Sequence, residues 1–341
     1  MTDVPGELMA HRPHLTLLQK TTTFVSWLMA GAIFLSVGWM AMEPDDPLGA
    51  VSFLTRRQPL VMLVEVVALA AVTSGLATVI TARVLPDMGA FAASVGLAVV
   101  SVQGGTASFL LWENSAPGLT AGHGLAGRLI LDSVGWFVVV LASVITSAAV
   151  TRWLFGPAIA PDESGTGRLM PAGYDLPGLG LPLGRDSLDQ TRMAGGLKHL
   201  FVVAGVALLA YAWLCSVLYA RAIQHGQACF SVAVSVWIAT HVAHRVAPVG
   251  SALWGLGGVL LLAVGGFAWA GFRGPAEGLP AGIPPSHFLR VLPLQYVSVG
   301  TAAAIATSWS VRKHGANERV KHKTSPASER RTKPEGRRAK S

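Results

Sequence analysis

Long apolar stretches recur along the chain, separated by shorter segments that contain charged residues, glycine and proline. An α-helix rises about 1.5 Å per residue, so roughly 20 apolar residues cross a hydrocarbon layer of about 30 Å. Eight stretches approach or reach this length: Thr22–Met42, Leu60–Ala82, Met88–Trp112, Leu129–Thr151, Leu197–Ala220, Gln227–His244, Ser251–Phe272 and Val291–Trp309. The pattern predicts an all-α fold, a polytopic bundle of about eight membrane-spanning helices.

Composition agrees with a chain whose main solvent is lipid. Hydrophobic residues make up 52% of the 341 residues and charged residues only 13%, whereas soluble domains carry about 25% charged residues. The first stretch runs to Met42 without a charge, which is too long for a signal-peptide core, so we expect a retained first helix. The loops are too short for a catalytic domain and show no nucleotide-binding or hydrolase motif, which favours a non-enzymatic protein.

The stretches divide the chain into five parts. Residues 1–21 form an N-terminal segment, residues 22–151 the first four membrane helices and residues 197–309 the last four. Residues 152–196, rich in glycine and proline, are predicted to be an irregular loop between the two sets. Residues 310–341 contain few apolar side chains to bury, so we expect a disordered basic tail.

The tail also predicts the orientation in the membrane. Eleven basic and three acidic residues follow Trp309, so the tail carries an excess equal to the net charge of +8. Basic segments stay in the cytoplasm, and eight spans then place both termini there. We expect the tail to lie on anionic lipid. The alternative is docking of the tail to a ribosome, RNA or an acidic protein partner, and the absence of an RNA-binding motif argues against nucleic acid. Abundant alanine, glycine and arginine point to a GC-rich bacterial genome and an inner-membrane protein.

Three histidines form the first candidate site. His241 and His244 are spaced i, i+3 on one helical face. His199 lies at nearly the same depth on the preceding helix, if the two helices form an antiparallel hairpin. Converging imidazoles can bind a metal or ligate haem iron. The alternative is three histidines that serve packing or lie at the membrane interface. Without a haem-attachment or zinc motif, the sequence does not name the cofactor.

Two carboxylates form the second candidate site. Glu65 lies near the external end of the second predicted helix, and Asp132 lies near the external end of the fourth. Arg128, one turn before Asp132, and Arg290, at the start of the eighth helix, are expected at similar depth. The four side chains form either structural ion pairs or, if the carboxylates face a cavity, a proton or cation site.

Three functions follow from these candidates. The leading one is a non-enzymatic scaffold, assembly factor or subunit of a larger membrane complex, because polar residues within the helices are few and lie near helix ends. The second is a secondary transporter that uses the two carboxylates, with helix breaks at Gly104-Gly105 and Pro293. The third is a haem- or metal-binding redox protein that uses the three histidines.

Overall fold

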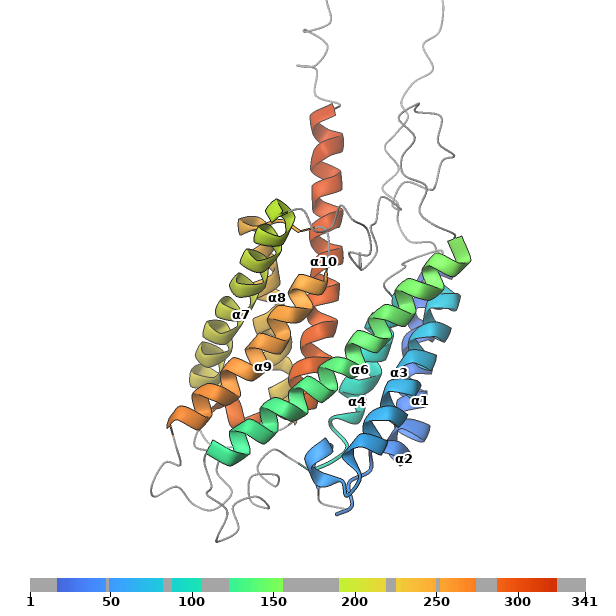
Figure 1. Ribbon diagram of the computed structural model, residues 1–341. Coiled ribbons are helices and arrows are strands. Elements are labelled where there is room, and N and C mark those ends of the chain that lie inside the picture. The colour runs from blue at the N-terminus through green and yellow to red at the C-terminus, as the bar shows by residue number, and fades with distance from the viewer. Residues whose placement is uncertain are drawn as a thin grey trace, which may run out of the picture.

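The computed structural model shows a bundle of helices that run alongside one another (Figure 1). Within the described residues it contains no β-strand, so the predicted all-α class is confirmed. The described residues are 17–46, 49–81, 88–105, 123–155, 190–218, 225–249, 252–273 and 287–323.

The first helix set comprises residues 17–155. Its first helix is interrupted by a π-helical turn, a local irregularity that adds one residue to a turn. A loop with one turn of 3-10 helix leads to the next helix. The elements are α1 (Leu17–Ile33), η1 (Phe34–Gly38), α2 (Trp39–Met42), η2 (Phe53–Thr55), α3 (Pro59–Thr81), α4 (Met88–Val100) and α6 (His123–Phe155).

The second helix set comprises residues 190–323 and is built from four helices. A second turn of 3-10 helix lies directly before the last of them. The elements are α7 (Gln190–Leu218), α8 (His225–Val246), α9 (Leu253–Arg273), η4 (His287–Arg290) and α10 (Pro293–Lys323).

Among the described residues, six helical segments are long and apolar enough to cross a membrane: the α1–α2 segment, α3, α6, α7, α8 and α9. Helix α4 has only 13 residues, about 20 Å of helix, and is shorter than the hydrocarbon layer. Helix α10 is long enough, but buried polar residues and a basic end lower its hydropathy. The chain is therefore a polytopic helical membrane protein.

The helices extend further than the apolar stretches. Helix α6 continues to Phe155 and α7 begins at Gln190, so both enter the segment predicted as irregular, of which residues 156–189 lie outside the described residues. Helix α10 continues to Lys323, although the disordered tail was predicted to begin at residue 310. No proline occurs between Pro293 and Pro326, so nothing in the backbone forces an earlier end.

Helix α10 joins the two helix sets. It packs against α4 and α6 of the first set and against α8 and α9 of the second. Close approaches rely on small residues, as expected where lipid gives no hydrophobic drive. A Cβ at Gly258 of α9 would lie 2.6 Å from Val203 Cβ of α7, so only glycine permits this contact.

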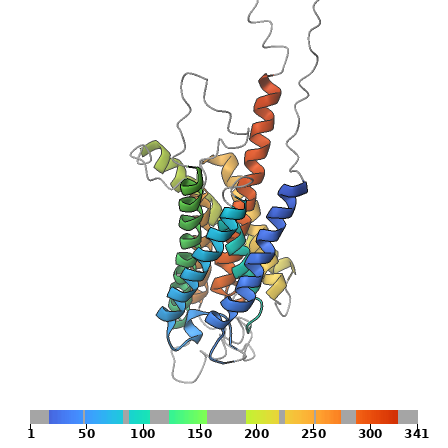
Figure 2. The same cartoon turned by 90° about the vertical axis from the view of Figure 1, so that its right-hand side faces the viewer.

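Helix α1 begins and α10 ends at the same end of the bundle, which we call the tail end (Figures 1 and 2). The opposite end, which we call the far end, contains the loop between α2 and α3 and the start of α10. Both described chain ends thus lie on one side, as an even number of crossings requires. Assignment of that side to the cytoplasm stays a prediction from the charge of the tail.

Candidate functional site

Asp132 of α6 binds the loop between α2 and α3 at the far end. Its side chain is buried, with 2% of the residue exposed. Asp132 Oδ2 accepts a hydrogen bond from Ser52 Oγ at 2.9 Å, and Oδ1 accepts one from the Phe53 backbone N–H at 2.8 Å. The Phe53 ring stacks on Trp136, with ring centroids 4.4 Å apart. The carboxylate therefore holds the loop against the helix bundle.

The same loop packs closely on the end of α4. Gly105 N donates a hydrogen bond to Gly49 O at 2.7 Å. A Cβ at Gly104 would lie 3.0 Å from both Gly49 O and Val51 N, so a larger residue would push the loop away. Helix α4 has already ended at Val100, so the predicted break at Gly104-Gly105 falls in the turn after the helix.

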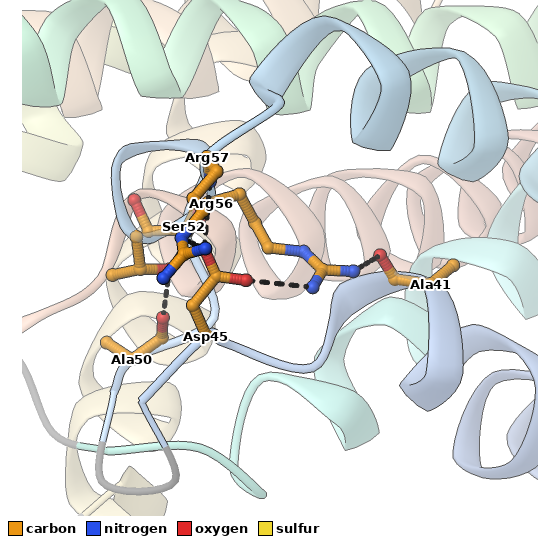
Figure 3. Close-up of polar contacts among 7 residues, drawn as sticks. Ala41, Asp45, Ala50, Ser52, Arg56 and Arg57 are labelled. Carbon is orange, nitrogen blue, oxygen red and sulfur yellow. Dashed lines mark hydrogen bonds and ion pairs between the residues drawn. The ribbon is translucent and has the colours of Figure 1, made fainter.

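An ion pair closes this loop at its exposed side, where Asp45 contacts both Arg56 and Arg57 (Figure 3). Arg56 Nη1 lies 3.3 Å from Asp45 Oδ1, and Arg56 Nη2 donates to Ala41 O at 3.0 Å. The Arg57 backbone N–H donates to Asp45 Oδ2 at 3.0 Å, while the Arg57 side chain is 93% exposed. Exposed ion pairs contribute about 0–1 kcal/mol, so the buried Asp132 contacts dominate.

The structure places the four residues of the predicted carboxylate site in different surroundings. Glu65 and Arg128 are exposed and Arg290 is half-buried, whereas Asp132 is buried beneath the loop. Within the described part of the chain, the ion pairs are those of Asp45, so neither carboxylate pairs with Arg128 or Arg290. Asp132 faces the loop instead. The use of Glu65 and Asp132 in transport stays a prediction.

Two of the three predicted histidines lie together at the tail end of the bundle. The rings of His199 on α7 and His244 on α8 meet edge to face, with centroids 4.8 Å apart. His199 is 1% exposed, and its Nδ1 lies 2.8 Å from Ala247 O, so Nδ1 carries the proton and donates. His241 does not join them and stacks on Trp237, at 5.9 Å between centroids.

This histidine geometry does not match a haem held by two imidazoles. Two iron–nitrogen bonds of about 2 Å, with the ring radii added, separate the ring centroids by roughly 6 Å. The centroids of His199 and His244 are closer than this. Over the described ranges, no three His, Cys, Asp or Glu residues are grouped so that they could hold a metal ion. Haem or metal binding stays a prediction.

Two tyrosines bind η4, the short helix before α10. Tyr211 Oη of α7 donates to His287 O at 3.0 Å, and Tyr296 Oη of α10 donates to Phe288 O at 3.2 Å. Burial lowers the pKa of the His287 imidazole, and the charge of Arg290 lowers it further. Sequence reasoning missed both tyrosines, because an aromatic residue within an apolar stretch gives no sign of its hydrogen-bond partner.

Pro293, predicted as a break within the eighth membrane helix, is instead the first residue of α10. A proline at this position needs no helical hydrogen bond for its nitrogen and has a suitable φ angle. The helix therefore begins at Pro293 and is not interrupted by it.

An apolar groove opens to the side of the bundle between α4, α8 and α10. Its volume is about 470 Å³, and its lining consists of phenylalanine, valine, alanine and cysteine side chains. None of these lining residues carries a charge. The smallest of them are Ala98 on α4, Ala233 on α8, and Ala302, Ala303 and Ala306 on α10. Sequence reasoning gave no means of placing these five alanines, which lie on three separate helices, in one groove.

Comparisons with known proteins give no match. No family model matches the chain, and no significant match exists to a curated protein sequence or to a solved structure. The function is therefore inferred from the geometry of this polytopic membrane protein alone.

Proposed function

We propose that this protein is a non-enzymatic membrane scaffold: a subunit or assembly factor that holds a transmembrane helix of a partner protein in the groove between α4, α8 and α10. The observation that carries the proposal is the groove itself, about 470 Å³ in volume and lined by apolar side chains. A surface of this kind suits association within the bilayer.

The groove lies between two helices, α4 and α8, that pack mainly on other neighbours. Helix α8 packs on α7 and α10, and α4 packs on α1, α3, α6 and α10. The described residues of α4 and α8 do not pack extensively on each other, so the groove lies between them. A helix placed there contacts all three walls of the groove.

The chemistry of the lining favours a helix over a lipid molecule. Five of the lining residues are alanines, and small side chains at such interfaces let helix backbones approach closely. A lipid tail would also fit an apolar groove, but the lining offers no charged side chain to bind a headgroup. We therefore expect a partner helix whose larger apolar side chains fill the groove.

Three buried polar residues of the far end support a non-enzymatic role. Asp132 binds the loop between α2 and α3, and Tyr211 and Tyr296 bind the backbone of η4. Each of these side chains has a partner within the fold. A buried polar side chain can indicate a catalytic role, but the hydrogen bonds of these three residues explain their burial.

Site-specific photo-crosslinking in intact membranes of the native host tests the proposal. A benzophenone amino acid replaces Val99 in the groove, and the matched control carries it at Val72, a lipid-exposed residue of α3. We expect Val99 to yield a crosslinked peptide that mass spectrometry assigns to a membrane-spanning segment of one defined protein. Val72 should yield lipid adducts.

A groove-filling variant makes this test specific. Ala302→Leu adds bulk inside the groove, whereas Ala68→Leu adds the same bulk on an exposed position of α3. We expect Ala302→Leu to lower the Val99 crosslink about tenfold, which corresponds to about 1.4 kcal/mol, and Ala68→Leu to leave it unchanged. The proposal is wrong if Val99 yields only lipid adducts or a second copy of this chain, or if Ala302→Leu has no effect.

A further inference from the structure

A polar junction lies next to the far end of the groove. It joins Gln295 at the start of α10, His225 at the start of α8 and the backbone of Ser101 after α4. Cys229 and Val299, which line the groove, follow His225 and Gln295 by one helical turn. The junction therefore connects the first and second helix sets directly below the groove.

The orientation of the Gln295 amide is fixed by the backbone. Gln295 is 1% exposed, and its Oε1 accepts a hydrogen bond from Leu292 N at 3.1 Å. A backbone N–H can only donate, so the amide oxygen must face Leu292. The amide nitrogen must then face His225 Nδ1, 2.8 Å away, with Ser101 O at 3.4 Å as a weaker second acceptor.

This arrangement fixes the protonation state of His225. The amide nitrogen can only donate, so Nδ1 of the imidazole must accept and cannot carry a proton. The proton of the neutral ring then lies on Nε2, and the ring also hydrogen-bonds to the backbone of Gly104. His225 thereby holds Gln295 of α10 on one side and the turn after α4 on the other.

A second proton on His225 would break the junction. Protonated Nδ1 becomes a donor and faces the donor N–H groups of Gln295. The amide cannot flip to offer its oxygen, because Leu292 N would then lose its acceptor while buried. The junction is stable with a neutral ring and unstable with a charged one.

We propose that His225 is a proton-sensitive latch between the two helix sets: the neutral ring ties α4, α8 and α10 together, and protonation releases Gln295 and loosens the far end of the groove. This inference does not depend on what occupies the groove. It depends only on the donors and acceptors at the junction.

The groups that face the ring do not compensate a positive charge. From α10 the ring meets the uncharged amide of Gln295, and from the turn after α4 it meets the backbone of Gly104. On its own helix the next titratable group is the thiol of Cys229. No charged side chain among the described residues pairs with His225. The junction favours the neutral ring, so protonation requires a lower pH than the value near 6.5 at which an imidazole titrates in water. The latch should therefore open towards the acidic end of the interval from pH 7.5 to 5.

Thermal unfolding of the full-length protein in mild detergent at pH 7.5 and pH 5 tests the latch. His225→Asn keeps an acceptor near the position of Nδ1 but does not titrate. Because protonation favours the unfolded state, wild type should lose stability on acidification. We expect its unfolding midpoint to fall by at least about 3 °C more than that of His225→Asn. His241→Asn, on the same helix but outside the junction, is the matched control and should behave as wild type.

The variant Gln295→Glu reverses the expected sign. A carboxylate still accepts the Leu292 N–H, and its second oxygen favours the protonated imidazole. Its stability should therefore hold or rise between pH 7.5 and pH 5. The proposal is overturned if wild type and His225→Asn show the same pH dependence, or if Gln295→Glu is destabilised by acid as strongly as wild type.

Labelling of Cys229 in membranes reports the opening without unfolding. A lipid-soluble maleimide is applied to the Cys215→Ala variant, so that Cys229 is the single thiol. The ratio of labelling rates between this protein and the same protein with His225→Asn cancels the intrinsic pH dependence of the thiol. We expect the ratio to rise about fivefold between pH 7.5 and pH 5, about 1 kcal/mol. An unchanged ratio contradicts the latch.

Discussion

Two short 3-10 helices at the far end, η2 in the first helix set and η4 in the second, are built alike. Each contains a Phe-Leu pair, and both phenylalanines, Phe53 and Phe288, are 8% exposed. Each is followed within a few residues by a proline that opens the next long helix, Pro59 for α3 and Pro293 for α10. The same local design thus leads the chain back into the membrane twice.

The two segments are held by different chemistry. In η2 a buried carboxylate, Asp132, accepts from the Phe53 N–H. In η4 the hydroxyls of Tyr211 and Tyr296 donate to backbone carbonyls. Asp132 makes two hydrogen bonds to the loop that contains η2, whereas each tyrosine makes one to η4. The first segment therefore depends on one residue, whereas the second divides its support between two.

Among the variants that test this comparison, loss of Asp132 should lower the free energy of unfolding most. Asp132→Ala leaves Ser52 Oγ and the Phe53 N–H buried without their acceptor, so we expect a loss of about 3–5 kcal/mol in the free energy of unfolding. Thermal or denaturant unfolding in detergent measures it.

Asp132→Asn is the control for this prediction. Its amide oxygen still accepts from Phe53, and its amide nitrogen can donate to Ser52 Oγ, so we expect a loss of about 1 kcal/mol. If Asp132→Asn is as unstable as Asp132→Ala, the charge itself and not the hydrogen-bond geometry holds the loop.

Loss of either tyrosine hydroxyl should lower the free energy of unfolding less than loss of Asp132. Tyr211→Phe and Tyr296→Phe each remove one neutral hydrogen bond but keep the ring, so we expect about 1 kcal/mol for each variant. The two rings lie 5.7 Å apart, so the double variant should deviate from additivity. The same unfolding assay checks this, and a loss above 3 kcal/mol for either single variant contradicts the division of support.

Features that depend on the local pattern of apolar residues were predictable from the sequence. The length of an apolar stretch determines whether a helix can cross the membrane, so the bundle and its helices followed from the chain alone. Of the three histidines expected to converge, the structure brings His199 and His244 together, because both lie near the open end of one helical hairpin, where depth can be counted from the turn. His241 stacks on Trp237 instead. Helix ends were less accurate, since α10 continues into a polar segment that has no apolar pattern.

The sequence could not supply partners that are distant along the chain. Asp132 was recognised as a polar residue near a helix end, but its partner Ser52 lies 80 residues away in a loop. Spacing on a helical face pointed instead to Arg128. Gln295 and His225, 70 residues apart, escaped notice for the same reason, because neither residue stands out until α8 and α10 are packed together.

The smallest expected effect on stability concerns the ion pair beside η2, between Asp45 and Arg56. Among the described residues, η4 has no such ion pair. Asp45 contacts Arg56, whose side chain is 25% exposed and also donates to Ala41 O. A double-mutant cycle of Asp45→Ala and Arg56→Ala should give a coupling energy of about 0.5 kcal/mol. Each single variant also removes a second contact, the bond to Ala41 O in Arg56→Ala and the bond from the Arg57 N–H in Asp45→Ala, so only the cycle isolates the energy of the pair.

The salt dependence of the coupling energy shows whether this ion pair contributes to the difference between the two segments. A solvent-exposed pair is screened, so the Asp45–Arg56 coupling should fall towards zero between about 0.05 M and about 0.5 M salt. Asp132 is buried, so the effect of Asp132→Ala should not change over the same range. A coupling above 2 kcal/mol that resists salt would mean that η2 is held from both sides. In that case the first segment would share its support between two contacts, as η4 does, and the contrast between them would disappear.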